Sequence, residues 1–479
     1  MSMYIPKILT NSFVYTVLGV LQKAINFFLL PLYTIYLTPA DYGVINVVMS
    51  IASFFSFFFT LSLQGASTRF NFKYADDSEK VRKIWGTNFL AICFNSLLWG
   101  ILIFLTHRFV LDKISGDIAF YPYLLIGLLT TLLSPLYLYY QAYLQAKQKA
   151  LAFSINSLLF LFVTILSTIL LVVFLRMEAL GVLIANLIVN SIFVIYVIIV
   201  FSYKVRLRID AELLKESLSY SLPLLPHNLS GWVNGMLDRL FINKLVNAAS
   251  VGLYSIGNQF GFIINTLGLG INQAFVPWFF EKEKSEVGCK QIVHMANIGI
   301  GILLIISFSI SIFAKEILFL MTSPSYHVAW KIIPVLCYAN LFDCFYYFFV
   351  AVLFLNKTSH LSYVTFSSAI IGAIINYVFI LNLGYMGAAY SLLFVQLVKS
   401  IVVLILSLKK RPDIDYKWKI YYSETVFSLV VFFFLNNYID FQSLWEIIGV
   451  KILLLLFFVV AVYLFNRRSV KVILSLFNR

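Results

Sequence analysis

The chain has 479 residues, of which 61% are hydrophobic and 12% are charged, and its formal net charge is +14. Soluble domains carry about 45–50% apolar and about 25% charged residues, so a water-soluble fold of this composition would expose apolar patches that aggregate. Composition therefore excludes an ordinary soluble enzyme and predicts an integral membrane protein. In such a protein, Lys and Arg are first of all topology signals and not a nucleic-acid footprint.

Fourteen apolar stretches are long enough to cross a bilayer, which takes about 20 residues of helix. The stretches are continuous and do not alternate between apolar and polar residues, so they favour helices over a membrane β-barrel. Short connections leave no room for a separate soluble domain. The predicted spans are 9–36, 44–68, 84–106, 118–145, 151–175, 179–202, 217–243, 250–280, 291–314, 328–355, 360–382, 386–408, 420–438 and 445–465.

Basic residues alternate between the two sides of this arrangement. With the N-terminus in the cytoplasm, the connections predicted to lie inside hold most of the Lys and Arg residues, and the alternation persists through all fourteen spans. Because loops rich in Lys and Arg stay on the cytoplasmic side, this pattern places both termini in the cytoplasm.

An internal repeat relates the two halves of the apolar region. Leu9 matches Leu218 and Gly43 matches Gly252, in both cases at an offset of 209 residues. Each repeat holds six spans, and an even number gives two parallel lobes, which predicts a central cavity and alternating access between them. The predicted division is an N-terminal six-helix lobe at 1–208, a C-terminal six-helix lobe at 209–410, and two additional helices with a cytoplasmic tail at 411–479.

Catalytic and cofactor motifs are missing from the sequence. There is no Gly-rich phosphate loop followed by Lys and Ser or Thr, no His-Glu-x-x-His, and no cysteine spacing typical of a metal site. We therefore expect a transporter and not an enzyme, with no metal and no cofactor.

Charged residues within spans are costly and are functional candidates by default. Lys23, Arg239 and Lys399 are the cations predicted to face a substrate cavity, and Asp238 and Asp343 are the carboxylates predicted to take part in ion coupling. Pairing of Lys23 with a carboxylate such as Asp343, purely for packing, is the alternative for that lysine. Adjacent helical residues point about 100° apart, so Asp238 and Arg239 are expected to find partners other than each other.

Polar and aromatic side chains near these charges complete the predicted cavity lining. Asparagines and glutamines on a helix serve either as cavity lining or as hydrogen-bonding contacts between helices, and both interpretations stay open. The candidates are Gln22, Asn26, Asn228, Trp232, Asn234 and Gln273.

Prolines interrupt the first span of each repeat. Pro31 lies late in 9–36, while Pro223 and Pro226 lie early in 217–243. Interruptions in the corresponding helices of two repeats point to a transport site.

Two segments at corresponding positions of the repeats carry a family resemblance. The first segment, from Leu30-Pro31-Leu32-Tyr33 through Leu37-Thr38-Pro39-Ala40-Asp41-Tyr42-Gly43, resembles the first-loop signature of bacterial polysaccharide-export membrane proteins. Leu237-Asp238-Arg239-Leu240-Phe241 and Ser250-Val251-Gly252-Leu253-Tyr254-Ser255 resemble the start of their second half. Over nearly its whole length the chain resembles the multidrug/oligosaccharidyl-lipid/polysaccharide (MOP) exporter superfamily and, within it, the O-antigen or polysaccharide repeat-unit flippases.

This resemblance implies an alternating-access flippase of the bacterial cytoplasmic (inner) membrane. Its substrate would be an undecaprenyl-pyrophosphate-linked oligosaccharide used to build O-antigen, lipopolysaccharide, capsule or exopolysaccharide. Membrane lipids, the polysaccharide polymerase and the chain-length machinery are the implied partners, with no nucleic acid among them. An ion gradient or the membrane potential is the expected energy source.

Three alternatives follow from departures from that pattern. Many repeat-unit flippases have twelve spans, and fourteen is typical of the branch that flips lipid-linked peptidoglycan precursors. That branch usually carries several arginines in the cavity of its first lobe, where this chain has Lys23. A cation-coupled multidrug exporter is the next alternative, and a membrane sugar polymerase or transferase is the most distant one.

Overall fold

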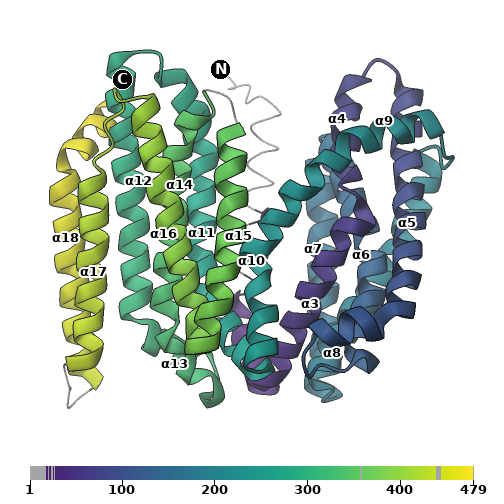
Figure 1. Ribbon diagram of the computed structural model, residues 1–479, viewed down its shortest axis with the longest axis horizontal. Helices are drawn as coiled ribbons and strands as arrows, with labels where there is room; N and C mark the ends of the chain where they lie inside the picture. Colours follow the sequence, from purple (N-terminus) through teal and green to yellow (C-terminus); the bar gives the residue numbers. More distant parts are fainter. Residues whose placement is uncertain are drawn as a thin grey trace. The chain divides into compact units, whose positions relative to one another are not determined.

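The computed structural model describes residues 18, 19, 21, 22, 25, 27–355, 359–438 and 444–477. The described residues form helices joined by short connections, with no β-strand among them, which confirms the all-α prediction. They divide into two compact units, Met1–Gly252 and Leu253–Arg479, each a bundle of helices (Figure 1). The division of the sequence repeats at 208/209 and the central cavity stay predictions.

The first unit contains long helices interrupted by short turns of other helix types. Its elements are α2 (Leu30–Tyr36), α3 (Pro39–Thr60), α4 (Leu63–Lys73), α5 (Ser78–Ile114), η1 (Phe120–Leu124), α6 (Leu125–Ala146), α7 (Ala150–Thr168), η2 (Ile169–Phe174), α8 (Glu178–Lys204), α9 (Ala211–Ser221), η3 (Leu222–Leu224) and α10 (Leu225–Leu245).

The second unit begins within α11 (Ala248–Lys282), whose first turns belong to the first unit. Its further elements are α12 (Glu286–Ile312), α13 (Ala314–Met321), η4 (Pro324–Lys331), α14 (Ile333–Leu353), α15 (Ser359–Leu383), α16 (Tyr385–Lys410), α17 (Trp418–Tyr438) and α18 (Leu444–Phe477).

A helix lies at the position of every predicted span from 44–68 onward, and the structure describes only part of 9–36. Among the described residues, ten helices are long and apolar enough to cross a membrane by length and composition. Helices α10, α11 and α17 are not among those ten. The count of fourteen spans therefore stays a prediction.

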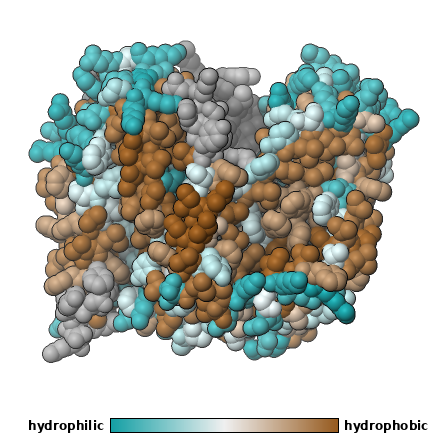
Figure 2. Space-filling model, viewed as in Figure 1, coloured by the Kyte–Doolittle hydropathy of each residue, from teal (hydrophilic) through white to brown (hydrophobic). Residues whose placement is uncertain are grey.

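Hydrophobic side chains on the outside of both units match a lipid environment. On the face shown in Figure 2, hydrophobic residues cover the middle of the helices and hydrophilic residues gather at the helix ends. Helices α7 and α18 expose large apolar side chains such as Phe162 and Phe457. In water such surfaces would drive aggregation, whereas in a bilayer they contact acyl chains.

Aromatic rings from α5, α6 and α8 form the core of the first unit. The ring of Trp85 lies 5.0 Å from Tyr139 and 5.1 Å from Tyr143, and Phe89 lies 4.9 Å from Phe201. All five side chains are buried. Edge-to-face and tilted contacts of this kind add about 0.5–1.5 kcal/mol per pair beyond area burial, so they hold the three helices in one arrangement.

Helix α14 lies at the centre of the second unit, packed against α12 and α16. Helices α17 and α18, which the sequence presents as additions to the repeats, pack beside α12 at one edge of this unit (Figure 1). Ser469 on α18 bonds to His294 Nδ1 and accepts from Asn297 Nδ2, both at 2.9 Å, and Tyr338 donates to Ser428 at 2.8 Å. These bonds make α17 and α18 part of the core of the unit.

Helices α3 and α11, which occupy corresponding positions in the two sequence repeats, carry equivalent N-terminal caps. At α3, the Thr38 hydroxyl accepts from the Asp41 backbone N–H at 3.2 Å, and the Asp41 carboxylate accepts from the Thr38 N–H at 2.9 Å. At α11, the Asn247 side-chain oxygen accepts from the Ser250 N–H at 2.8 Å. Position 247 is 209 residues after position 38, so the repeat offset reproduces a cap that satisfies an otherwise unpaired N–H group.

A reciprocal backbone contact joins these two helix starts. A Cβ added at Gly43 would overlap the carbonyl oxygen of Ala248, and a Cβ added at Gly252 would overlap the carbonyl oxygen of Pro39. Gly252 lies 209 residues after Gly43, and Ala248 lies 209 residues after Pro39, so the two contacts are equivalent under the repeat. Glycine is required at both positions because only a residue without a side chain lets the backbones approach so closely.

Candidate substrate and ion sites

Helix α3 is separated from α4 by a sharp backbone turn late in the predicted span 44–68. Leu61 and Ser62 both adopt positive φ, +46° and +55°, a conformation that costs a non-glycine residue about 1–3 kcal/mol. Asn95 of α5 donates from Nδ2 to the carbonyls of Phe58 and Phe59, at 2.6 and 2.8 Å. The amide thus satisfies carbonyls that the end of α3 leaves unpaired.

A second interruption lies beside the first, where α9, η3 and α10 replace one continuous helix. Pro223 and Pro226 start η3 and α10 respectively, which confirms the predicted effect of these prolines. Asn228 of α10 donates from Nδ2 to the Ser62 hydroxyl at 2.9 Å. The two breaks are therefore hydrogen-bonded to each other, and α10 runs beside α3 (Figure 1).

Trp232 continues the contact between α10 and α3 one turn further on. Its indole N–H lies 3.1 Å from the Ser50 carbonyl and 2.9 Å from the Ser53 hydroxyl, and its ring lies 4.9 Å from Phe54. The side chain is buried. Asn228 and Trp232 thus serve as contacts between helices in this structure, and their role in substrate binding stays a prediction.

Asp238 and Arg239 form an ion pair, contrary to the expectation that neighbouring helical residues point too far apart. Arg239 Nη1 lies 3.5 Å from Asp238 Oδ1, and the Arg239 backbone N–H donates to the same oxygen at 2.8 Å. The guanidinium folds back along α10 and also donates to the Gly235 carbonyl at 2.7 Å. A long, flexible arginine can curl back in this way, and the 100° separation of the Cβ directions does not prevent it.

Burial makes this pair costly. The side chains of Arg239 and Asp238 are 5% and 9% exposed, and Arg239 Nε has no hydrogen-bond partner among the described residues. Desolvating a guanidinium without satisfying every donor carries a penalty. An anion that reached Arg239 would relieve it.

A second charged group lies inside the other unit. Lys399 of α16 lies 2.5 Å from Asp343 Oδ1 of α14, and Asn265 of α11 donates to Asp343 Oδ2 at 3.0 Å. Lys399 Nζ also lies 4.9 Å from the centre of the Tyr346 ring. Asp343 therefore pairs with Lys399, and three helices supply the charges and the amide of one mostly buried site.

The other predicted residues have no hydrogen bond or ion pair to these two groups among the described residues, or they fall outside the described residues. Gln22 is a half-buried helical residue and Gln273 is exposed on α11. Lys23 and Asn26 lie outside the described residues, as does the side chain of Asn234.

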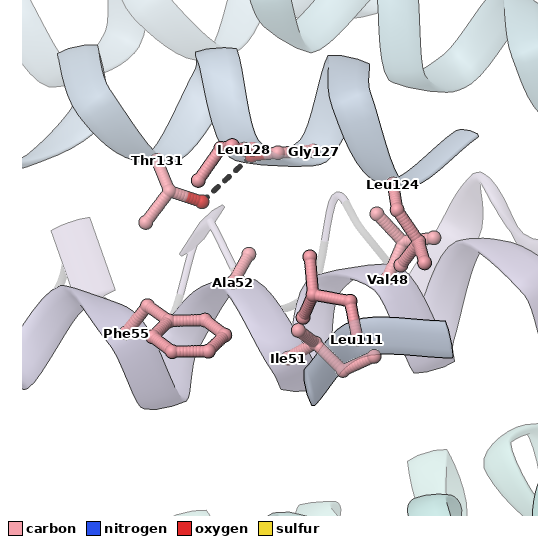
Figure 3. Close-up of a pocket in the computed structure, with 9 residues that line it drawn as sticks. All are labelled: Val48, Ile51, Ala52, Phe55, Leu111, Leu124, Gly127, Leu128 and Thr131. Carbon is pink, nitrogen blue, oxygen red and sulfur yellow. Dashed lines mark hydrogen bonds between the residues drawn. The ribbon is translucent and has the colours of Figure 1, made fainter. Parts of the chain in front are cut away.

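An apolar pocket lies between α3, the end of α5 and the start of α6 (Figure 3). Its one hydroxyl, that of Thr131, points back to its own helix and donates to the Gly127 carbonyl at 2.7 Å. With no charged side chain in its lining, this pocket does not fit a diphosphate. It is lined by Val48, Ile51, Ala52, Phe55, Leu111, Leu124, Gly127, Leu128 and Thr131.

Several polar residues of this region were not predicted from the sequence. Ser50, Ser53, Ser62 and Asn95 make the hydrogen bonds that hold the breaks and the indole. The sequence contains a pattern that could have identified them, since each is a polar residue in an otherwise apolar span. Serines are common in such spans, however, and only the three-dimensional contacts distinguish these from the rest.

Solved structures share the arrangement of helices. The chain is similar to one described as lipid II flippase MurJ in an inward closed conformation, with a TM-score of 0.67, 14% identity, and coverage of 96% of this chain and 99% of that one. An inward-facing multidrug resistance MATE family transporter of the MOP superfamily matches with a TM-score of 0.60 and 14% identity over 82% of this chain and 95% of that chain. A MOP superfamily transporter from Pyrococcus furiosus matches with a TM-score of 0.54 and 14% identity over 85% and 96%.

At such low identity the likeness establishes the fold. Together with the apolar helices described above, it defines a multi-pass membrane protein with the fold of the MOP transporters.

Sequence relatives lead to the family. The chain is 23% identical over 294 residues to "Lsg locus putative protein 1" of Haemophilus influenzae, covering 60% of this chain and 70% of the relative. It is 39% identical over 67 residues to an uncharacterized membrane protein of the same organism, covering 14% and 16%. Residues 8–283 match the model of the family described as "Polysaccharide biosynthesis protein". The chain belongs to this family.

Proposed function

We propose that this protein is a flippase for lipid-linked oligosaccharides. It moves undecaprenyl-pyrophosphate-linked repeat units from the cytoplasmic to the outer leaflet of the bacterial inner membrane by alternating access, with both termini in the cytoplasm. The product supplies the assembly of O-antigen, capsule or another exopolysaccharide. It acts as a transporter and not as an enzyme.

One combined observation carries this proposal: a member of the polysaccharide biosynthesis family shares its fold with a lipid II flippase over nearly the whole chain. The family supplies the link to polysaccharide. The structural relative supplies the link to movement of a lipid-linked sugar.

The buried cations fit the chemistry of a diphosphate headgroup. Charge-assisted hydrogen bonds from Arg or Lys to phosphate are among the strongest that proteins make, and low dielectric surroundings strengthen them. Arg239 offers a guanidinium with an unsatisfied Nε. Lys23 and Lys399 are the further cations, with Gln22, Asn26, Asn234 and Gln273 proposed to contact sugar hydroxyls.

Asp343 is the proposed coupling site in the second unit. Its carboxylate holds Lys399, so a proton or metal cation that took the carboxylate would release the ammonium group for an anionic ligand. Asp238 has the same relation to Arg239 in the first unit. In both places, binding of a proton or metal cation to the carboxylate would release the paired cation, which is proposed to bind substrate.

A lipid-linked peptidoglycan precursor is the second candidate substrate, favoured by the 0.67 TM-score of the lipid II flippase match. The two substrates share the diphosphate and the lipid and differ in the sugar. Cation-coupled export of drugs follows from the match to a multidrug resistance transporter, which covers less of this chain. A mainly cationic set of proposed ligands favours an anionic substrate over an organic cation.

A flipping assay in proteoliposomes tests the proposal. The wild type is expected to move a lipid-diphosphate-linked oligosaccharide between leaflets, and Lys23→Ala and Arg239→Ala are expected to lose this activity while remaining folded. Lys331→Ala, which removes an exposed charge from η4, is the charge-matched control and should retain it. Transport of lipid II alone would select the peptidoglycan alternative, and export of organic cations without movement of either lipid would contradict the flippase assignment.

A further inference from the structure

Cationic side chains lie over aromatic rings at one end of the first unit, on α4, α9 and the start of α5. This group is called the cation–aromatic platform below. It consists of Arg69, Phe70, Lys73, Tyr74, Lys80 and Tyr220.

Three rings form a continuous row in the platform. The Phe70 ring lies 6.0 Å from Tyr220 on one side and 6.1 Å from Tyr74 on the other. The guanidinium carbon of Arg69 lies 4.4 Å from the centre of the Tyr220 ring, and Lys80 Nζ lies 3.6 Å from the centre of Tyr74. Stacking on the rings restricts the directions in which these cations point.

The row rests on a buried support that ties three helices together. Asn88 of α5 donates from Nδ2 to the Ser67 hydroxyl of α4 at 2.8 Å and to the Ser217 hydroxyl of α9 at 3.0 Å. Beneath the rings, apolar side chains of the same helices pack around Phe70. They are Ala66, Ile84 and Leu213. The platform is therefore built on a fixed base.

Positive charge is in excess on this surface. Glu216 is paired with Lys73 at 2.6 Å and accepts from the Tyr74 hydroxyl at 2.7 Å. Arg69 is exposed, and neither its guanidinium nor the ammonium group of Lys80 has an ion pair or hydrogen bond to a described residue. Arg69 and Lys80 thus have no ion pair among the described residues, and each lies over a ring at one end of the row.

We propose that the cation–aromatic platform is the entry site that binds the diphosphate group of the lipid-linked sugar before it crosses the membrane. Arg69 provides a rigid planar donor for one phosphate, and Lys80 provides a compact charge for the next. This inference rests on the proposed function and on the predicted orientation, in which α4 and α9 lie at the cytoplasmic side.

The geometry goes beyond what the orientation of a membrane protein requires. An excess of Lys and Arg on the cytoplasmic side accounts for positive charge, but it does not require the cations to be stacked on rings. Nor does it require the nearby carboxylates Glu216 and Glu79 to be paired with Lys73 and with Arg82 and Arg206. Two available cations along a row also suit a diphosphate better than the single phosphodiester of an ordinary phospholipid. The chemistry shared by both ligands is a phosphate group, so the experiment must separate them.

A binding measurement on the full-length protein in detergent tests the site. The probe is a fluorescent short-chain prenyl diphosphate carrying one sugar, and the competitor is short-chain phosphatidylglycerol. Arg69→Gln is expected to weaken binding about tenfold, because the variant loses one strong charge-assisted hydrogen bond to the probe. Tyr220→Leu, which keeps the charge but removes the ring beneath it, is expected to weaken binding by a smaller factor.

Arg208→Gln is the matched control, because Arg208 is an exposed arginine in the connection before α9 and outside the platform. It should change the affinity by less than about twofold, as expected of a surface charge that does not contact the ligand. Binding of the wild type should also fall with salt more steeply than binding of Arg69→Gln, because the variant has one phosphate contact fewer.

Three outcomes would overturn the inference: a wild type that does not bind the probe, unchanged binding by Arg69→Gln, or equal competition by phosphatidylglycerol, which would make the platform a phospholipid site. Failure of the proposed function is distinguishable from these. A wild type that binds the probe through Arg69 but moves no lipid in proteoliposomes would remove the flippase assignment and leave the site in place.

Discussion

Asp343 and Lys399 show how one contact between helices changes the interpretation of two residues. Taken singly, each is a charge in the middle of an apolar span and a candidate for its own role. In the structure they form one ion pair, supported by Asn265. The carboxylate therefore offsets the lysine charge inside the second unit.

Breaking this pair on one side should destabilise the protein. Lys399→Met leaves the Asp343 carboxylate without its cation in a mostly buried place, and removal of one partner of a buried pair costs about 3–5 kcal/mol. The double variant Asp343→Asn, Lys399→Met should recover much of that loss, because no unpaired charge remains. The coupling is measured by the melting temperatures, in detergent, of the wild type, the single variants Lys399→Met and Asp343→Asn, and the double variant. A double variant less stable than either single variant would contradict the prediction.

A pH dependence follows from Arg411 and Asp413 in the connection between α16 and α17. Arg411 donates to the carboxylate, at 2.8 Å from Nη2, and lowers the pKa of Asp413 from 3.8 to about 2. A lowered pKa means that the folded state favours the ionised form. The stabilisation is therefore complete above pH about 4 and is lost as the pH falls toward 2.

The difference in melting temperature between the wild type and Asp413→Asn should accordingly be constant from pH 7 to 5 and should shrink below pH 4. Asp415→Asn, which changes a neighbouring carboxylate outside the contacts of Arg411, is the control. A difference that grows as the pH falls would show that Asp413 is not stabilised in this way.

At the level of the helices, two adjacent breaks characterise the first unit. The α9–α10 break follows from prolines, which remove a backbone donor and clash with the preceding turn. The α3–α4 break has no proline and depends on Leu61 and Ser62 in the left-handed conformation. This second break persists because neighbouring helices supply the missing hydrogen bonds.

Asn95 is expected to be the residue that maintains the α3–α4 break. Asn95→Leu removes the donor to two carbonyls at the end of α3, and leaving a buried acceptor unsatisfied costs about 1–3 kcal/mol. The melting temperature should fall. In the control, Thr106→Val, it should change little, because Thr106 of the same helix bonds only to its own turn.

The reciprocal contact between α3 and α11 makes an equally direct prediction. Gly43→Ala and Gly252→Ala should each destabilise the protein, because the new methyl group would overlap a backbone carbonyl that cannot move away like a side chain. Gly270→Ala on α11 is the matched control, with nothing near its added methyl group. It should stabilise the helix by about 0.5–1 kcal/mol, the usual gain for alanine over glycine. Equal melting temperatures for all three variants would rule out the close contact.

At the level of the whole molecule, the number of membrane crossings follows from the helices and from the basic residues between them. Ten described helices satisfy the length and composition of a span, whereas the alternation of Lys and Arg predicts fourteen spans. Helices α10, α11 and α17 do not meet that composition, as expected where a helix faces protein or a polar path and not lipid.

Cysteine labelling in intact cells can test the fourteen-span topology. In a variant without the four native cysteines, Lys113→Cys and Lys244→Cys should react with a membrane-impermeant reagent added from outside. Lys83→Cys and Lys410→Cys should react only after the cells are opened. Reaction of Lys410→Cys from outside would mean that an odd number of crossings separates it from Lys83.

Much of this molecule is predictable from local sequence. Apolar length determined the helices, and Pro223 and Pro226 determined a break. Thr38 caps the start of α3, and the Asp210 carboxylate caps the start of α9 by accepting from the backbone N–H groups of Glu212 and Leu213. These features depend on residues a few positions apart, so a linear pattern contains them. The membrane class and the family followed from composition and from motifs such as Thr38-Pro39-Ala40-Asp41-Tyr42-Gly43.

Tertiary structure alone decided which charges meet. The pairing of Asp343 with Lys399, the break at Leu61 that Asn95 of another helix supports, and the docking of α17 and α18 onto α12 were not apparent from the chain. In a low-dielectric interior a charge takes whichever partner the packing brings within reach. That choice depends on contacts between distant segments, and no local pattern of residues encodes it.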